Sequence, residues 1–155
     1  MQRPPRWSLH RPVALAREAV VGIIRRQGRM LVIERGPAAM LSGYWSPPSG
    51  RVEPGETQSE AVVREMQEEL GLAVRPLAKV WECLTDDGGY RLHWWTVEED
   101  GGPLAPDAGE VGAMKWVTAG EFLALDPTFR GDRDFFRNIL PTLGQPAPGT
   151  AGPTG

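Results

Sequence analysis

The chain has 155 residues, the length of one ordinary domain. It holds 17 Lys and Arg against 20 Asp and Glu, and this formal net charge of -3 argues against a protein dedicated to coating DNA. Hydrophobic residues make up 41% and charged residues 24%, which excludes wholesale disorder and fibrous repeats. The single cysteine, Cys83, cannot form an internal disulfide, so we expect a reducing, cytoplasmic location.

The two ends of the chain differ in composition from its middle. Residues 1–16 are rich in Arg and Pro, and we expect them to form an extended arm. Residues 144–155 contain only Gly, Pro, Ala, Thr and Gln, which predicts a disordered tail because no side chain there can build a core. Residues 17–143 are therefore the expected domain. No apolar run approaches the ~20 residues of a membrane helix, so no membrane partner is expected.

Apolar patterning and turn residues predict the elements in chain order. Two β-branched segments, 18–24 and 30–34, flank a polar turn and predict a β-hairpin. A Gly- and Pro-containing loop leads to a short strand at 44–46. Residues 56–70 lack Gly and Pro and predict a helix, with Gly71 as its C-cap. Five elements follow, in the order strand, strand, strand, helix, helix: 73–83, 90–98, 113–117, 119–125 and 133–143.

Strands and helices are mixed without a regular βαβ alternation. The predicted fold class is therefore α/β (α+β), with a mixed β-sheet sandwiched between helices. Trp94 and Trp95 are neighbours on one predicted strand, so their side chains must point to opposite faces of the sheet. We expect at least one of them in the core.

The 56–70 helix separates its apolar and charged side chains when it is projected at 100° per residue. One arc, expected to pack on a sheet, contains Val62, Val63, Met66 and Leu70. The opposite arc contains Arg64, Glu65, Glu68 and Glu69. Carboxylates at these spacings repel by roughly 0.2–0.5 kcal/mol per pair, and one arginine does not neutralise three of them. The arc is either a divalent-cation site, since hard cations prefer carboxylate oxygens, or a solvated acidic face.

The helix belongs to a longer pattern, which begins at Gly50 and reads GRVEPGETQSEAVVREMQEELGL. This segment resembles the signature of the MutT-like Nudix hydrolases at every defined position: Gly50, Glu56, Arg64-Glu65, Met66, Glu68-Glu69, Gly71 and Leu72. We call these 23 residues the box. The box holds six acids against two arginines, so the net acidity of the chain comes from this segment.

The resemblance implies a Nudix fold, with the box as loop–helix–loop. It implies a hydrolase that cleaves the diphosphate linkage of a nucleoside diphosphate derivative by water attack at phosphorus. Nucleoside triphosphates, nucleotide sugars, ADP-ribose and dinucleoside polyphosphates all remain open as substrates. The alternative is a catalytically silent Nudix-fold module that binds a nucleotide. The implied partner is a nucleotide-derived small molecule, with no stable nucleic-acid partner, and a homodimer is left open.

The resemblance also implies a divalent cation, Mg²⁺ or Mn²⁺, between the diphosphate and the box helix. By position, the implied metal ligands are the carboxylates of Glu65, Glu68 and Glu69 and the backbone carbonyl of Ser49. The implied supporting residues are Gly50, Glu56 and Gly71, and Glu56 orients the carboxylates together with Arg64. Ser49 stands where the family commonly has glycine. If the loop required a positive φ there, serine would cost about 1 kcal/mol.

The implied catalytic residues are Glu69, Glu65, Arg64 and Glu110. A carboxylate can accept the proton of the attacking water. Two candidates for this base remain open, Glu69 in the box and Glu110 in the loop 99–111. For Glu110 the alternative is a solvated loop residue.

Three residues are candidate substrate contacts: Trp45, Arg51 and Tyr90. Trp45 lies on the short strand that enters the box, where a substrate is expected, although core packing is the alternative. Arg51 can meet phosphates or simply face solvent. Tyr90 lies close to the position where dinucleoside-polyphosphate hydrolases of the family carry a tyrosine, but it also follows a turn.

Overall fold

The computed structural model describes residues 16–144. The expected arm and tail therefore lie outside the described residues, apart from Ala16 and Gly144. The strands are β1 (Arg17–Ile23), β2 (Arg25–Arg26), β3 (Arg29–Arg35), β4 (Trp45–Ser46), β5 (Ser49–Arg51), β6 (Val74–Leu84), β7 (Tyr90–Glu99) and β8 (Val111–Val117). The helices are α1 (Gln58–Leu70), α2 (Ala119–Leu123) and α3 (Arg130–Asp134), and α3 runs on into a π-helical turn (Phe135–Ile139) and a 3-10 turn (Leu140–Thr142).

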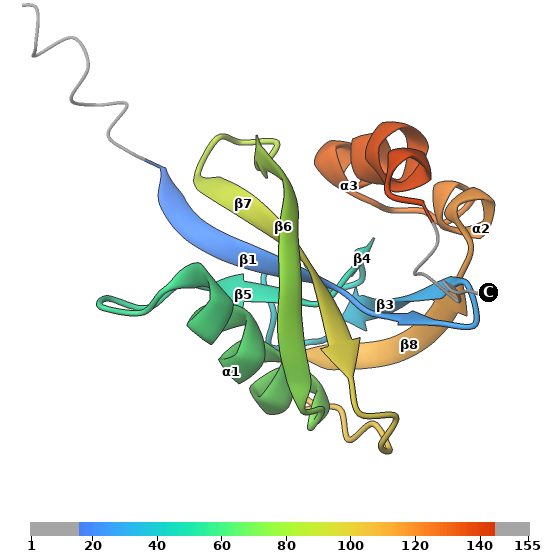
Figure 1. Ribbon diagram of the computed structural model, residues 1–155. Helices are drawn as coiled ribbons and strands as arrows, with labels where there is room; N and C mark the ends of the chain where they lie inside the picture. The colour runs from blue at the N-terminus through green and yellow to red at the C-terminus, as the bar shows by residue number, and fades with distance from the viewer. Residues whose placement is uncertain (1–15, 145–155) are drawn as a thin grey trace, which may run out of the picture.

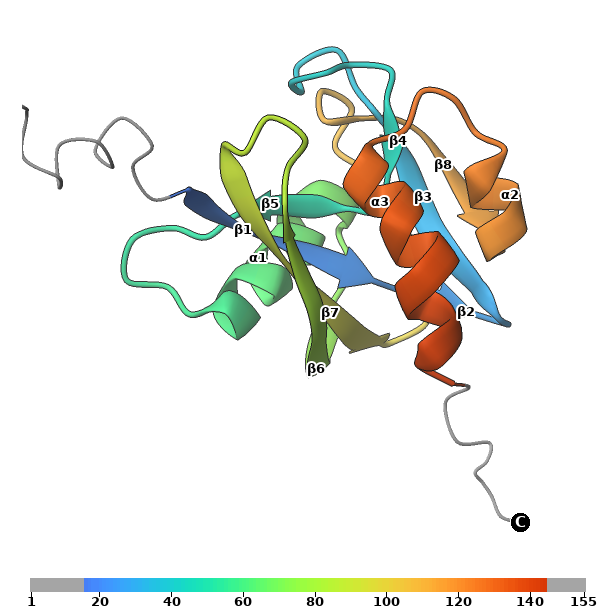
Figure 2. The same cartoon turned by 90° about the horizontal axis from the view of Figure 1, so that it is seen from above.

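The strands form two sheets between helices, which confirms the predicted α/β (α+β) fold class (Figure 1). In sheet A the order is β5-β1-β7-β6, with β1 antiparallel to β5 and parallel to β7. In sheet B, β3 pairs antiparallel with β2, β4 and β8. Figure 1 shows α3 on the opposite side of the molecule from α1, and Figure 2, seen from above, shows α3 lying over sheet B. Within residues 16–144, none of the helices has the length and apolar character needed to cross a bilayer.

The hairpin predicted from 18–24 and 30–34 is present only near its turn, where β2 pairs with β3 and the Leu31 N–H donates a 3.0 Å hydrogen bond to the carbonyl of Ile24. The pairing predicted for the rest of the two segments is wrong, because β1 pairs with β5 and β7 in sheet A, whereas β3 pairs with β4 and β8 in sheet B. Both long strands are buried over consecutive residues, 19–23 in β1 and 30–33 in β3. Such strands need cover on both faces, which an isolated hairpin cannot provide.

Two hydrophobic cores lie on the two sides of the sheets. The first contains Val20, Val62, Met66 and Leu70 and fills the space between α1 and the sheets. The second contains Val21, Trp94, Phe122, Phe135 and Phe136 and lies under α2 and α3. Trp94 is fully buried in the second core, whereas Trp95 packs against the first and donates a 3.0 Å hydrogen bond to Gln58. The prediction of opposite faces for the two tryptophans is confirmed.

The box helix begins two residues later than predicted and ends where predicted. Thr57 is its N-cap, and the Thr57 and Glu60 side chains form a capping box at the first turn. Gly71 follows the last turn with φ 65°, the left-handed conformation that glycine adopts without penalty. The remaining predicted elements are present with shifted ends. The largest shift is at α3, which begins at Arg130 rather than at residue 133.

Candidate active site

The buried face of α1 differs from the predicted one. Glu69, predicted on the exposed arc, is only 7% exposed, whereas Val63, predicted on the packed arc, is 37% exposed. The reason is that α1 packs against β1, β5 and β6, so its contact surface extends past the apolar side chains to the glutamates. The Glu65 and Glu69 carboxylates therefore lie at the junction between α1 and β5, whereas Glu68 is exposed.

Ser49 and Glu69 meet at this junction. The Ser49 N–H donates a 3.2 Å hydrogen bond to Oε1 of Glu69. Ser49 lies in β5 and is not among the residues with positive φ, so serine costs no backbone strain at this position. Burial, and then the negative charge of Glu65, raise the pKa of Glu69 to about 8. The role of the Ser49 carbonyl as a metal ligand stays a prediction.

Gly50 leaves room for the Glu65 side chain. A Cβ atom at residue 50 would lie 1.9 Å from Cδ of Glu65, a distance that non-bonded atoms cannot adopt. The Glu65 carboxylate therefore rests directly on the backbone of β5, and this burial raises its pKa. Glycine at position 50 is a steric requirement of the acidic cluster.

Arg64 is the cationic centre of the box. Its guanidinium donates two hydrogen bonds to Glu56, at 2.7 and 2.9 Å, and one to the carbonyl of Arg51 at 2.8 Å. Its Nη1 donates to Glu65 at 2.9 Å and to Glu68 at 3.0 Å. The Arg64 hydrogen bonds hold the pKa of Glu56 at about 2. The structure thus brings together the residues predicted to orient the carboxylates.

Carboxylate oxygens at this junction fit a divalent cation. Glu65 and Glu69 are hard oxygen donors, and the Glu65 charge reaches Glu69 strongly enough to raise its pKa. A cation beside the two carboxylates would offset their mutual repulsion and the free-energy cost of burying their charges. Glu68 turns toward Arg64 with 60% of its side chain exposed, and no three acidic, His or Cys side chains within residues 16–144 converge on one point. Glu68 would have to leave Arg64 to become a third ligand.

The second candidate base lies near the first. Glu110 is exposed in the loop before β8, and its charge contributes to raising the pKa of Glu69. The Glu110 charge thus acts on Glu69, although 41 positions separate the two residues in the sequence. Which of the two accepts a proton stays a prediction.

The three predicted substrate contacts lie on three strands: Trp45 in sheet B, and Arg51 and Tyr90 on either side of the start of β1 in sheet A. Trp45 is half-buried in β4, with Nζ of Lys115 5.0 Å from its ring centroid. Arg51 is exposed at the end of β5, beside the box. Tyr90 begins β7, and its N–H bonds to Oγ1 of Thr85 in the preceding turn. No hydrogen bond within the described residues links Tyr90 to the box.

Sequence reasoning missed Asp132. This residue of α3 is 4% exposed, and its Oδ2 has no hydrogen-bond partner within the described part of the chain. Burial, and then the charge of Asp86, raise the pKa of Asp132 to about 8. The positive charge of Arg35 lowers the pKa of both Asp132 and Glu69. The spacing of Asp132 to Phe135 and Phe136, three and four residues on, is the sequence signal that could have placed it on a buried face.

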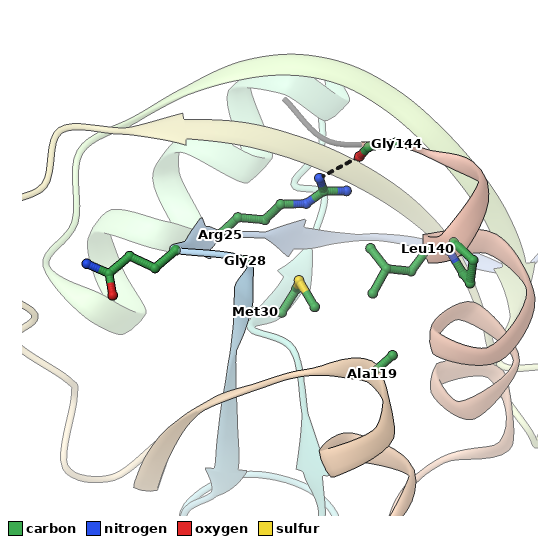
Figure 3. A pocket seen from close by; sticks show the side chains of 8 residues that line it. Arg25, Gly28, Met30, Ala119, Leu140 and Gly144 are labelled. Atoms are coloured by element: carbon green, nitrogen blue, oxygen red, sulfur yellow. Dashed lines mark hydrogen bonds between the residues drawn. The ribbon is translucent and has the colours of Figure 1, made fainter. Parts of the chain in front are cut away.

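A pocket of about 330 Å³ lies away from these residues, between the β2–β3 turn, α2 and the end of the C-terminal helix (Figure 3). Arg25 extends across it to donate a 3.0 Å hydrogen bond to the carbonyl of Gly144. Met30, Ala119 and Leu140 form apolar walls. None of the predicted site residues lines this pocket.

The mixed sheets and the acidic helix that packs against Gly50 of β5 agree with the fold that the resemblance to Nudix hydrolases implies. The family model described as NUDIX domain matches residues 15–139, so the chain belongs to the Nudix family and is a pyrophosphohydrolase. The chain is 35% identical over 108 residues to the CTP pyrophosphohydrolase of Escherichia coli, covering 68% of this chain and 78% of that protein. It is 33% identical over 111 residues to the 8-oxo-dGTP diphosphatase of E. coli, covering 68% and 86%. The solution structure of the E. coli ORF135 protein matches with a TM-score of 0.67 and 30% identity, over 79% of this chain and 87% of that one.

Proposed function

We propose that the chain is a Mg²⁺- or Mn²⁺-dependent hydrolase of the diphosphate linkage in nucleoside triphosphates. Nudix hydrolases generally depend on a divalent metal. The observation that carries the proposal is the buried carboxylate of Glu69, whose pKa the Glu65 charge helps to raise and which forms no ion pair within residues 16–144. Burial and the Glu65 charge disfavour the ionised form of Glu69, so a cation that compensates this carboxylate would be favoured here, and a bound cation in turn favours a diphosphate.

The relatives support triphosphates over the other open substrate classes. Two relatives that match more than two thirds of this chain carry the names CTP pyrophosphohydrolase and 8-oxo-dGTP diphosphatase. Asp132 is a candidate contact to the nucleobase, which all the open substrate classes share, because its buried Oδ2 lacks a partner in the described chain and a nucleobase edge offers complementary donors and acceptors. With its pKa raised to about 8, Asp132 is neutral at pH 7 and can donate as well as accept.

The proposed chemistry is hydrolysis by in-line attack of water at phosphorus. The bond from the water oxygen to phosphorus forms while the bridging P–O bond breaks, and the diphosphate leaving group departs with the bond electrons. Glu69 or Glu110 accepts the proton of the water. Arg64 and Glu56 keep the neighbouring carboxylates in position. A bound divalent cation supplies neutralisation of the phosphate charge and makes the attacking water more acidic.

A nucleotide panel tests this proposal. Purified protein with Mg²⁺ or Mn²⁺ would be assayed against CTP, 8-oxo-dGTP, dGTP, ADP-ribose, a nucleotide sugar and diadenosine tetraphosphate, with EDTA as the metal-free control. We expect turnover of at least one triphosphate to a nucleoside monophosphate and pyrophosphate. Turnover confined to another class would contradict the proposed substrate. No turnover of any compound, together with thermal stabilisation by a nucleotide, would favour the silent binding module.

Two further sequence predictions accompany this proposal. We propose a cytoplasmic location, supported by the unpaired thiol of Cys83 among the described residues. The homodimer stays open, and size-exclusion chromatography with light scattering would decide it.

A further inference from the structure

The loop that carries Glu110 is fastened to the end of the box helix. The Ala105 N–H donates a 2.7 Å hydrogen bond to the carbonyl of Leu70, and the Asp107 N–H donates a 2.9 Å bond to the carbonyl of Glu69. Carbonyls in the last turn of a helix have no partner inside the helix, so this loop supplies them. The backbone of Asp107 is thus hydrogen-bonded to the backbone of Glu69, and Glu69 is one of the two candidate bases.

Asp107 also holds the other candidate base. Its side-chain Oδ1 accepts hydrogen bonds from the N–H groups of Gly109 at 2.9 Å and Glu110 at 3.0 Å. Its backbone carbonyl accepts from Glu110 at 3.1 Å and from Val111 at 2.8 Å. Asp107 therefore joins the backbone of Glu69 to the backbone of Glu110 through consecutive hydrogen bonds.

Gly36 holds Glu110 from the opposite side. The Gly36 N–H donates a 2.8 Å hydrogen bond to the carbonyl of Glu110, and the Ala38 N–H donates one of equal length to the carbonyl of Gly109. A Cβ at residue 36 would lie 2.6 Å from the Gly109 carbonyl oxygen and 2.9 Å from the backbone carbon of Glu110. Any side chain at this position would therefore push the Glu110 loop away from β3.

We infer that Asp107 and Gly36 are positioning residues, which fix the Glu110 carboxylate relative to Glu69. The inference rests on the proposed function. Neither residue contacts the reacting atoms in this account, and each acts through the backbone of Glu110. Holding a carboxylate in place before the reaction removes the cost of ordering an exposed loop in each turnover. The Glu110 side chain stays exposed and can meet substrate while its backbone is fixed.

A double-mutant cycle tests the inference for Asp107. The single variants Asp107→Ala and Glu110→Gln and their combination would be assayed on the best triphosphate of the panel. Asp107→Ala should lower kcat by about tenfold and change KM by less than about twofold. In the Glu110→Gln background the same substitution should change kcat by less than about twofold, because Asp107 then has no carboxylate to position.

Asp107→Asn is the conservative control, since its amide oxygen can still accept both backbone hydrogen bonds. It should restore most of the kcat lost in Asp107→Ala. Gly36→Ala should reproduce the Asp107→Ala loss by displacing the same loop from the other side. Gly120→Ala is its matched control, because a Cβ there meets no atom within 4 Å. Thermal unfolding of each variant would identify any loss that is caused by misfolding.

Three results would overturn the inference: an equal loss from Asp107→Ala in both backgrounds, no rescue by Asp107→Asn, or full activity of Glu110→Gln. Each leaves the proposed function standing, because the wild-type protein is active in each. Absence of wild-type turnover would overturn the proposed function itself and would be seen before any variant is assayed.

Discussion

The Ser49 N–H donates a hydrogen bond to the Glu69 carboxylate, which joins β5 to the last turn of α1. The strand that begins the box therefore determines where the last glutamate of the box lies. Gly50, the next residue of β5, has no side chain and so leaves the space that the Glu65 carboxylate occupies. The acidic cluster is a property of the strand and the helix together.

Gly50→Ala should disable the site with little effect on the fold. The added methyl would occupy the place of the Glu65 carboxylate, which can move only by leaving β5. We expect kcat to fall by about tenfold or more, because a catalytic group displaced by an ångström commonly costs that much. Kinetics and calorimetric Mn²⁺ titration would measure the loss. Wild-type values for both would show that Glu65 does not need its observed position.

Arg64→Lys should destabilise the box, because a single ammonium group cannot make all the hydrogen bonds that the Arg64 guanidinium donates to Glu56, Glu65 and Glu68. Urea unfolding at pH 7 should show a loss of about 1–2 kcal/mol. Arg64 depresses the pKa of Glu56, so the stabilisation is present above pH 4.5 and is lost as the pH falls toward 2. The difference between variant and wild type should therefore shrink at pH 3.

Arg51→Lys is the control for this experiment, because the Arg51 side chain makes no hydrogen bond within the described residues. It should match the wild type at both pH values. An equal loss in both variants would mean that arginine at these positions stabilises the box nonspecifically.

Asp132→Asn should change how stability depends on pH. Burial raises the pKa of Asp132 from 3.8 to about 8, so the folded protein keeps a proton that the unfolded chain loses. The stabilisation is complete below pH 3.8 and is lost as the pH rises to about 8. From pH 6 to pH 9, the free energy of unfolding should fall by roughly 2–3 kcal/mol more in the wild type than in the variant. Parallel curves would contradict the assignment.

Glu68→Gln should raise the Mg²⁺ concentration needed for half-maximal activity by about tenfold, a typical effect of losing a carboxylate ligand or its support. Glu60→Gln is the matched control on the same helix. Glutamine preserves the capping interaction with Thr57, so this variant should behave like the wild type. Comparable shifts in both variants would refute a metal-ligand role for Glu68.

The sequence predicted those parts of the site that depend on spacing along one element. Gly71 ends the box helix with the expected left-handed conformation, and Arg64 meets Glu56 and Glu65 as expected. Local chemistry determines the helix cap, and the family resemblance implied the Arg64 pairing, because Glu56 lies before the helix and eight residues from Arg64.

Features that depend on distant partners were not predictable in this way. The burial of Glu69 requires β5, the pairing of β1 requires β7, and the burial of Asp132 requires the second core. Projecting the box helix at 100° per residue places the Glu69 carboxylate on the solvent side. Only the contacts of the helix with the strands show that Glu69 is buried. The same limit applies to Asp107, whose role depends on the carbonyl of Glu69.

The most direct test of the account compares Glu69→Gln with Glu60→Gln, two identical chemical changes on one helix. Calorimetric Mn²⁺ titration and kcat would be measured for both proteins. Glu69→Gln should bind Mn²⁺ at least about tenfold more weakly and lose at least about 100-fold in kcat, while Glu60→Gln should match the wild type. Unchanged Mn²⁺ affinity and kcat in Glu69→Gln would contradict the central claim.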